Sequence, residues 1–146
     1  MNISILSDAE CKAALGRIVS EFGDGHIKEG QYVFDVITRL PAGFAEKRLT
    51  INELISSLKS QTMLLVIFDP HSANNASRLH LLHSLGIDED VPGVKVAREN
   101  LARFFADNDC DFYVTAIDGA LLAAASHEDE FRGKDRVVWC PVAPSG

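Results

Sequence analysis

The feature that most constrains the fold is a hairpin pattern near the C-terminal end of the chain. Two apolar, strand-like runs at residues 112–117 and 120–126 are separated only by Asp118 and Gly119. An Asp-Gly pair between apolar runs is typical of a two-residue type I′ turn, in which both central residues have φ above zero. The pattern therefore predicts two neighbouring antiparallel strands around which the rest of a sheet is organised.

Two capping boxes mark the expected starts of helices. Ser7 is followed three residues later by Glu10, and Thr50 is followed in the same way by Glu53. In this pattern the hydroxyl and the carboxylate each satisfy a backbone N–H group at the helix start. Behind the first box, apolar residues recur at helical spacing up to Gly23. These residues are Cys11, Ala14, Leu15, Ile18, Val19 and Phe22.

The remaining elements alternate between helical and extended patterns. Residues 63–68 contain no polar side chain, which is typical of a central strand buried on both faces. We expect further strands at 32–38 and at 137–140, the latter ended by Pro141, and further helices at 73–85 and 97–107. Because helices mostly come first and strands gather at the end, the order favours an α+β fold. We predict one domain over residues 1–146, with a mainly antiparallel sheet of four to five strands and helices mostly on one face.

The charge of the chain limits the kinds of partner. With 21 acidic and 14 basic residues, the formal net charge is −7. An acidic surface repels phosphate backbones, so we expect no nucleic acid partner. It attracts a basic protein, or it keeps the chain in solution without any specific partner.

Cysteine usage and the lack of a leader-like segment indicate a cytoplasmic protein. The cysteines Cys11, Cys110 and Cys140 are odd in number and form no Cys-x-x-Cys pair, as expected in a reducing compartment. The N-terminus has neither the basic nor the apolar region of a signal peptide. The longest apolar run, residues 63–68, is too short to span a bilayer, so we expect no membrane association.

Acidic residues gather at the open end of the predicted hairpin. Its strands run back from the turn, so the residues before the first strand and after the second should emerge together. We call this group the acidic mouth and expect it to bind a partner, unless it is only a solvated strand exit. It comprises Asp109, Asp111, His127, Glu128, Asp129 and Glu130. A second acidic loop contains Asp88, Glu89 and Asp90.

Catalytic and metal-binding patterns are sparse. His80 and His83 lie three residues apart on a predicted helix, and Asp69 and His71 follow a strand. These four are the candidate metal ligands, but no His-Glu-x-x-His pattern accompanies them. The glycine-rich nucleotide loops and the Gly-x-Ser-x-Gly nucleophile pattern are also absent. We therefore expect no cofactor and no resident metal.

These observations favour a non-enzymatic cytoplasmic domain that binds a basic protein through an acidic surface. A small acidic α+β domain without catalytic motifs is the profile of a bacterial toxin-neutralising (immunity) protein or of an adaptor. One alternative is a small metal-dependent or hydrolytic enzyme that uses His71, His80 and His83, or His127. Another is a subunit that forms a homodimer through the edge of its sheet.

Overall fold

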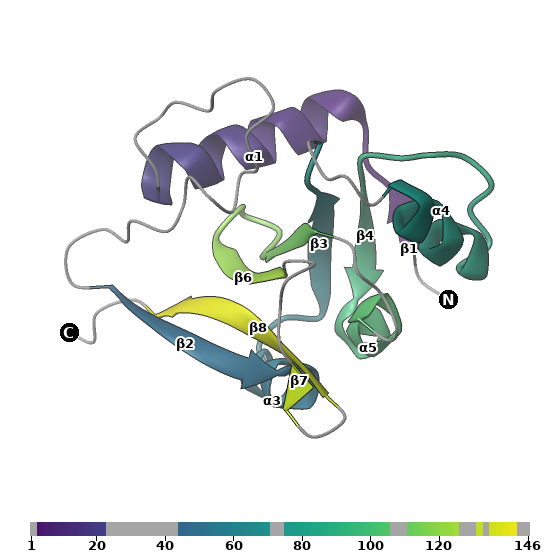
Figure 1. Cartoon of the computed structure of the whole chain (residues 1–146). Coiled ribbons are helices and arrows are strands. Elements are labelled where there is room, and N and C mark those ends of the chain that lie inside the picture. The colour runs from purple at the N-terminus through teal and green to yellow at the C-terminus, as the bar shows by residue number, and fades with distance from the viewer. Residues whose placement is uncertain are drawn as a thin grey trace.

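The computed structural model of the chain describes residues 3–22, 44–70, 75–105, 111–125, 131–132 and 135–142 (Figure 1). Its helices are α1 (Asp8–Phe22), α3 (Ile51–Ser57), α4 (Asn75–Ser84) and α5 (Leu101–Phe105), with a 3₁₀ turn at Arg98–Asn100. Its strands are β1 (Ile3–Ile5), β2 (Ala45–Thr50), β3 (Met63–Phe68), β4 (Gly93–Ala97), β5 (Phe112–Thr115), β6 (Leu121–Ala125), β7 (Phe131–Arg132) and β8 (Asp135–Val142). The predicted strand at 32–38 lies outside the described residues.

Every strand pair in the described residues is antiparallel. Seven strands follow one another in the order β1-β4-β3-β5-β6-β8-β2, and β7 pairs with β8 beside this path. The α+β class and the antiparallel sheet are therefore confirmed. The predicted count of four to five strands is too low, because short β1, charged β2 and β4 carry no long apolar run.

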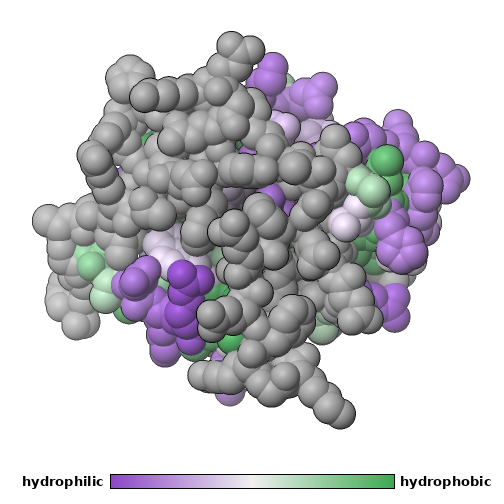
Figure 2. All heavy atoms as spheres, in the orientation of Figure 1, coloured by the Kyte–Doolittle hydropathy of each residue, from purple (hydrophilic) through white to green (hydrophobic). Residues whose placement is uncertain are grey.

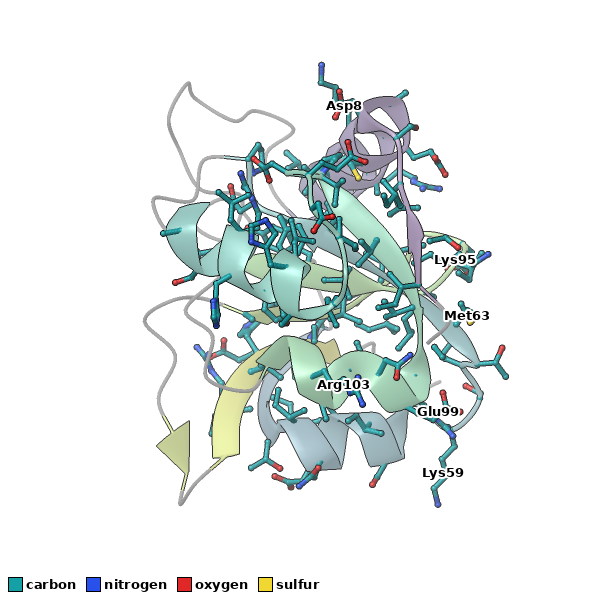
Figure 3. The ribbon with its side chains drawn as sticks, turned by 90° about the vertical axis from the view of Figure 1, so that its right-hand side faces the viewer. Asp8, Lys59, Met63, Lys95, Glu99 and Arg103 are labelled. Atoms are coloured by element: carbon teal, nitrogen blue, oxygen red, sulfur yellow. The ribbon has the colours of Figure 1, made fainter. Side chains whose placement is uncertain are left out.

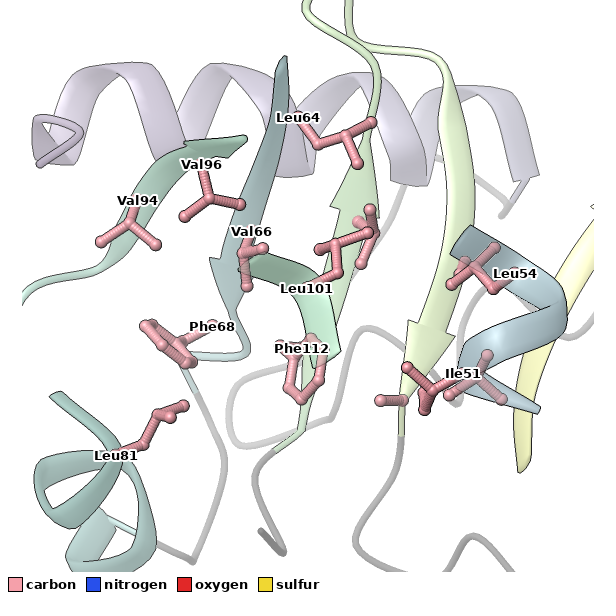
Figure 4. Close-up of a cluster of buried hydrophobic side chains, with 14 of the residues drawn as sticks. Ile51, Leu54, Leu64, Val66, Phe68, Leu81, Val94, Val96, Leu101 and Phe112 are labelled. Carbon is pink, nitrogen blue, oxygen red and sulfur yellow. The ribbon is translucent and has the colours of Figure 1, made fainter. Parts of the chain in front are cut away.

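The sheet separates two apolar layers. Alternate residues of β3 point to opposite faces: Leu64, Val66 and Phe68 join a large core, whereas Ile67 packs toward α1. The large core also takes up apolar side chains of α3, α4 and α5, as the close-up of Leu54, Leu81 and Leu101 shows (Figure 4). Helix α1 lies on the other face: it runs across the top of the view in Figure 1 and behind the strands in Figure 4. Of the described helices, α1 alone covers that face.

Both predicted capping boxes are confirmed. The Glu10 backbone N–H donates to the Ser7 hydroxyl (3.1 Å), and the Ser7 N–H donates to the Glu10 carboxylate (3.0 Å). At α3 the Glu53 N–H donates to the Thr50 hydroxyl (3.2 Å), and the Thr50 N–H donates to the Glu53 carboxylate (3.1 Å). Each box satisfies two backbone groups that a helix start leaves unpaired.

The hairpin is confirmed, but its predicted turn type is wrong. Strands β5 and β6 pair with a register shift after Val114. The Gly119 N–H donates to the Ala116 carbonyl (2.9 Å), so Ile117 and Asp118 are the central residues of the turn. Gly119 follows with φ at +96°, and the Ala116 N–H donates to the Ala120 carbonyl (2.9 Å), which closes the loop. The loop is thus longer than two residues and uses the left-handed glycine after the turn.

Two predicted boundaries are also wrong. The helix expected at 97–107 is preceded by strand β4, and the α-helix begins only at Leu101, after the 3₁₀ turn. Strand β8 does not stop at Pro141 but continues to Val142, with Pro141 paired to Glu46 of β2. A proline is tolerated at a strand position whose backbone nitrogen does not have to donate a hydrogen bond to the neighbouring strand.

Candidate functional site

A groove opens where the start of α1 meets α4 and the chain entering β4. Its cavity volume is about 340 Å³, within the range of pockets that hold ligands or side chains. We call it the α1–α4 groove. It is lined by Asp8, Cys11, Lys12, Leu15, Phe68, Pro70, Arg78, Asp90, Val91 and Pro92. Its floor is mainly apolar, and charged side chains complete its lining.

Helix periodicity explains which α1 residues reach the groove. Asp8, Cys11, Lys12 and Leu15 recur three or four positions apart and therefore lie along one side of the helix. Asp8 projects outward at the start of α1 (Figure 3). The helix thus supplies both a carboxylate and an ammonium group to the groove.

The opposite wall is fixed by a bidentate ion pair. The Arg78 Nε and Nη2 atoms donate to the two Asp90 carboxylate oxygens at 2.8 and 2.7 Å. The Arg78 side chain is only 14% exposed, whereas the Asp90 side chain is 49% exposed. Two parallel hydrogen bonds make this a geometrically specific contact, and it ties the acidic loop to α4.

The second acidic loop predicted from the sequence borders this groove. Asp88, Glu89 and Asp90 are all exposed, and Asp90 itself is a lining residue. The neighbouring surface over α4 is covered mainly by hydrophilic side chains (Figure 2). The loop therefore presents two further carboxylates beside a groove with an apolar floor.

Cys11 forms part of the groove wall as an apolar group. Burial, reinforced by the Glu10 and Asp8 carboxylates, raises the pKa of its thiol to about 11. The thiol is therefore protonated at neutral pH and is a poor nucleophile. Its sulfur packs so closely on β4 that a Cβ at Gly93 would lie 2.8 Å from it.

A second hollow lies between α1 and the hairpin loop. It has a volume of about 390 Å³ and is lined by Arg17, Ser20, Glu21, Asp118, Gly119 and Ala120. Arg17 donates through Nη1 to the Asp118 carbonyl (3.2 Å). The lining contains no large apolar side chain, so this hollow has no apolar floor for an anchoring side chain.

Of the acidic mouth, the structure describes Asp111. This residue is only 4% exposed, and its carbonyl accepts a hydrogen bond from the Asp69 N–H (2.9 Å). The start of β5 thus lies beside the end of β3, which brings Asp111 to the metal-ligand candidate Asp69. The other members, Asp109, His127, Glu128, Asp129 and Glu130, lie outside the described residues.

The candidate metal ligands are distributed between the interior and the surface. Asp69 is fully buried, and the Tyr113 hydroxyl donates to its carboxylate at 2.5 Å. His80 and His83 are both exposed on α4. His71 lies outside the described residues. Within the part of the chain that the structure describes, no three His, Cys, Asp or Glu side chains form a cluster that could hold a metal ion.

Sequence reasoning missed the α1–α4 groove. Cys11 and Leu15 were expected in a helix core, and Phe68 in a strand core, but nothing in the sequence places Arg78 against Asp90. Arg78 lies twelve residues before Asp90, and no local sequence pattern pairs the two residues. The antiparallel pairing of β3 with β4 brings the chain after β3 beside the chain before β4, and both line the groove.

Comparisons with protein-family models, curated proteins and solved structures find no match to this chain. Across the described residues, none of the helices is both long and apolar enough to cross a membrane. The groove and the surface around it are the features of the described structure that indicate a function.

Proposed function

We propose that this chain is a non-enzymatic protein-binding domain that presents an acidic surface to a basic protein partner. The observation that carries the proposal is the position of the exposed 88–90 loop beside the α1–α4 groove. An apolar floor next to exposed carboxylates suits a partner segment in which an apolar side chain neighbours a lysine or arginine. More specifically, we propose that it is a cytoplasmic toxin-neutralising or adaptor protein.

The charges around the groove support a basic partner. Asp8, Asp88, Glu89 and Asp90 contribute four negative charges, and Lys12 and Arg78 contribute two positive charges. Because Arg78 is engaged by Asp90, the exposed side of the loop is dominated by carboxylates. Such a surface speeds the approach of a cationic protein more than it strengthens the final complex.

The proposal is tested by capturing the partner from native cell extract and measuring its binding to the purified chain by biolayer interferometry. We expect a basic partner whose association rate falls as salt is raised. Glu89→Lys should lower that rate by about tenfold at low salt. Glu99→Lys is the matched control, because Glu99 is also an exposed glutamate but lies in the 3₁₀ turn before α5.

Equal effects of Glu89→Lys and Glu99→Lys would show that only net charge matters and that the 88–90 loop is not the binding surface. A captured partner with an acidic surface and salt-independent binding would contradict the proposal as a whole. Charge reversal at Glu128 and Asp129 tests in the same assay whether the acidic mouth contributes to binding.

A further inference from the structure

Strand β1 forms one end of the described sheet and is open to solvent. It pairs with β4 on one side, and no described strand pairs with it on the other (Figures 1 and 3). Ser4 is exposed, and Ile5 is 50% exposed although it is a large apolar residue. An open strand edge presents backbone donors and acceptors to any chain that can pair with them.

The register identifies which backbone groups point to the open side. Ser4 pairs with Lys95, and one step further along the Leu6 N–H donates to the Gly93 carbonyl at 3.0 Å. In an antiparallel ladder, hydrogen-bonded residues alternate with residues whose N–H and C=O groups point away. Ser4 and Leu6 therefore face β4, and the N–H and C=O groups of Ile3 and Ile5 face outward.

This outward pattern is complementary to itself. If a second copy approaches antiparallel with its Ser4 opposite Ser4, each Ile3 lies opposite an Ile5. All four outward-facing groups of each copy then find partners, which gives four N–H···O hydrogen bonds related by a two-fold axis. The side chains agree with this register, because Ile3 and Ile5 pair with Val96 and Val94 and so lie on one face.

We infer that β1 is a self-association edge, through which two copies of this chain join their sheets by β1–β1 pairing. The occupant is a second copy because the outward-facing groups of Ile3 and Ile5 complement those of another β1. Strand β1 carries no charged residue and no proline, two of the features that block such pairing, whereas its shortness is a third such feature and limits the strength of the dimer. In the dimer, Ile3 and Ile5 of both copies form one apolar cluster adjoining the large cores. This inference does not depend on the proposed function, because the α1–α4 groove contains no β1 residue.

The small size of the edge sets the expected strength. Three residues a side are far fewer than the 20–30 residues a side of a standard stable interface. We therefore expect a weak dimer, with a dissociation constant of about 0.1–1 mM. Because each copy carries a net charge of −7, added salt should strengthen the dimer by screening repulsion. Binding of a basic partner should respond to salt in the opposite direction.

The test is sedimentation equilibrium of the purified chain between about 10 μM and 1 mM, a range that brackets the expected constant. Ile5→Lys should raise the dissociation constant at least about tenfold, because it places like charges near the pairing axis. Ile117→Lys should leave the constant unchanged within about twofold. Ile117 is the matched control, since it is 48% exposed against 50% for Ile5 and lies in the hairpin loop.

Residue-specific amide signals distinguish edge pairing from other association. As concentration rises, the N–H groups of Ile3 and Ile5 should become protected from hydrogen exchange, whereas those of Ser4 and Leu6 should not change. A chain that stays monomeric to 1 mM would overturn the inference. So would a dimer that Ile5→Lys and Ile117→Lys weaken equally, or one that leaves the Ile3 and Ile5 amides unaffected.

Discussion

The two faces of the sheet are held to their helices in different ways. The face toward α3, α4 and α5 is one continuous apolar cluster that includes side chains from six strands. The face toward α1 carries two smaller apolar clusters and several polar contacts between elements. The first face is stabilised by non-directional burial, and the second also depends on hydrogen bonds of fixed geometry.

The polar contacts of the α1 side are specific. The Tyr113 hydroxyl donates to the buried Asp69 carboxylate, and the Trp139 Nε1–H donates to the Glu46 carboxylate at 2.9 Å. Arg17 of α1 packs its guanidinium against Gly119, where a Cβ would lie 2.7 Å from Arg17 Cζ. The first two contacts join neighbouring strands on this face, and the Arg17 contact ties α1 to the hairpin loop. Helix α1 also forms one wall of the α1–α4 groove.

Strand β5 shows the contrast in two neighbouring residues. Phe112 and Tyr113 are both fully buried but point to opposite faces. The phenylalanine meets Phe68 edge-on, with ring centroids 6.5 Å apart, whereas the tyrosine places its hydroxyl on Asp69. The two side chains differ by a single oxygen. The apolar ring of Phe112 lies on the face toward α3–α5, and the hydroxyl-bearing ring of Tyr113 lies on the face toward α1.

The largest effect is expected from a cavity in the large core. Leu82 of α4 is fully buried, so Leu82→Ala should lower the free energy of unfolding by about 2–5 kcal/mol. Urea denaturation followed by circular dichroism measures the change. Ile117→Ala is the control, because truncating a half-exposed side chain should lower the free energy of unfolding by under about 1 kcal/mol. Similar losses in the two variants would mean that the face toward α3–α5 is not the main source of stability.

Exchanging the hydroxyl between Phe112 and Tyr113 tests the contrast between the faces directly. Tyr113→Phe removes a donor to a buried carboxylate and should cost about 1–3 kcal/mol. Phe112→Tyr places a hydroxyl in the apolar cluster and should cost a similar amount, about 1–3 kcal/mol. Both changes are measured by urea denaturation. If either variant is as stable as the parent chain, the face that it probes does not discriminate between polar and apolar groups.

Local patterns in the sequence were sufficient to predict much of this fold. The capping boxes and the hairpin depend on contacts between residues close in the sequence, and β3 is recognisable from the apolar composition of six consecutive residues. The missed strands have a common cause. The residues of β2 read Ala-Glu-Lys-Arg-Leu-Thr, which resembles a solvated segment until Leu49 and Thr50 are buried by pairing with β8. Tertiary pairing decides such strands more than propensity does.

The candidate site was only partly predictable, because it also depends on contacts between segments far apart in the sequence. The 88–90 loop was recognised from its charge, and the structure shows that it is exposed. The groove beside it gathers residues from α1, β3, α4 and the chain before β4, which are far apart in the sequence. Periodicity assigned Cys11 and Leu15 to a helix face, but it does not say which other elements that face meets.

The smallest expected effects come from the two capping boxes, one on each face of the sheet. Thr50, at the start of α3, is 7% exposed and its capping bonds are partly buried, whereas the Ser7 bonds at the start of α1 are exposed. We therefore expect Thr50→Ala to cost about 1–2 kcal/mol and Ser7→Ala about 0.5–1 kcal/mol. Thermal unfolding at pH 7 measures both. A larger loss of stability from Ser7→Ala than from Thr50→Ala would show that α1 depends on its cap more than on its apolar contacts.

The α1 cap should also respond to pH. The hydrogen bonds from the Ser7 N–H and hydroxyl hold the pKa of Glu10 below its usual range. Because this pKa is lower in the folded chain, its contribution to stability is present above about pH 4.3, the unfolded value, and is lost as pH falls through the folded value. Glu10→Gln should therefore lower the melting temperature at pH 7, and the difference should vanish toward pH 2. A difference between the two chains that stayed constant over this range would assign the role of Glu10 to shape rather than to charge.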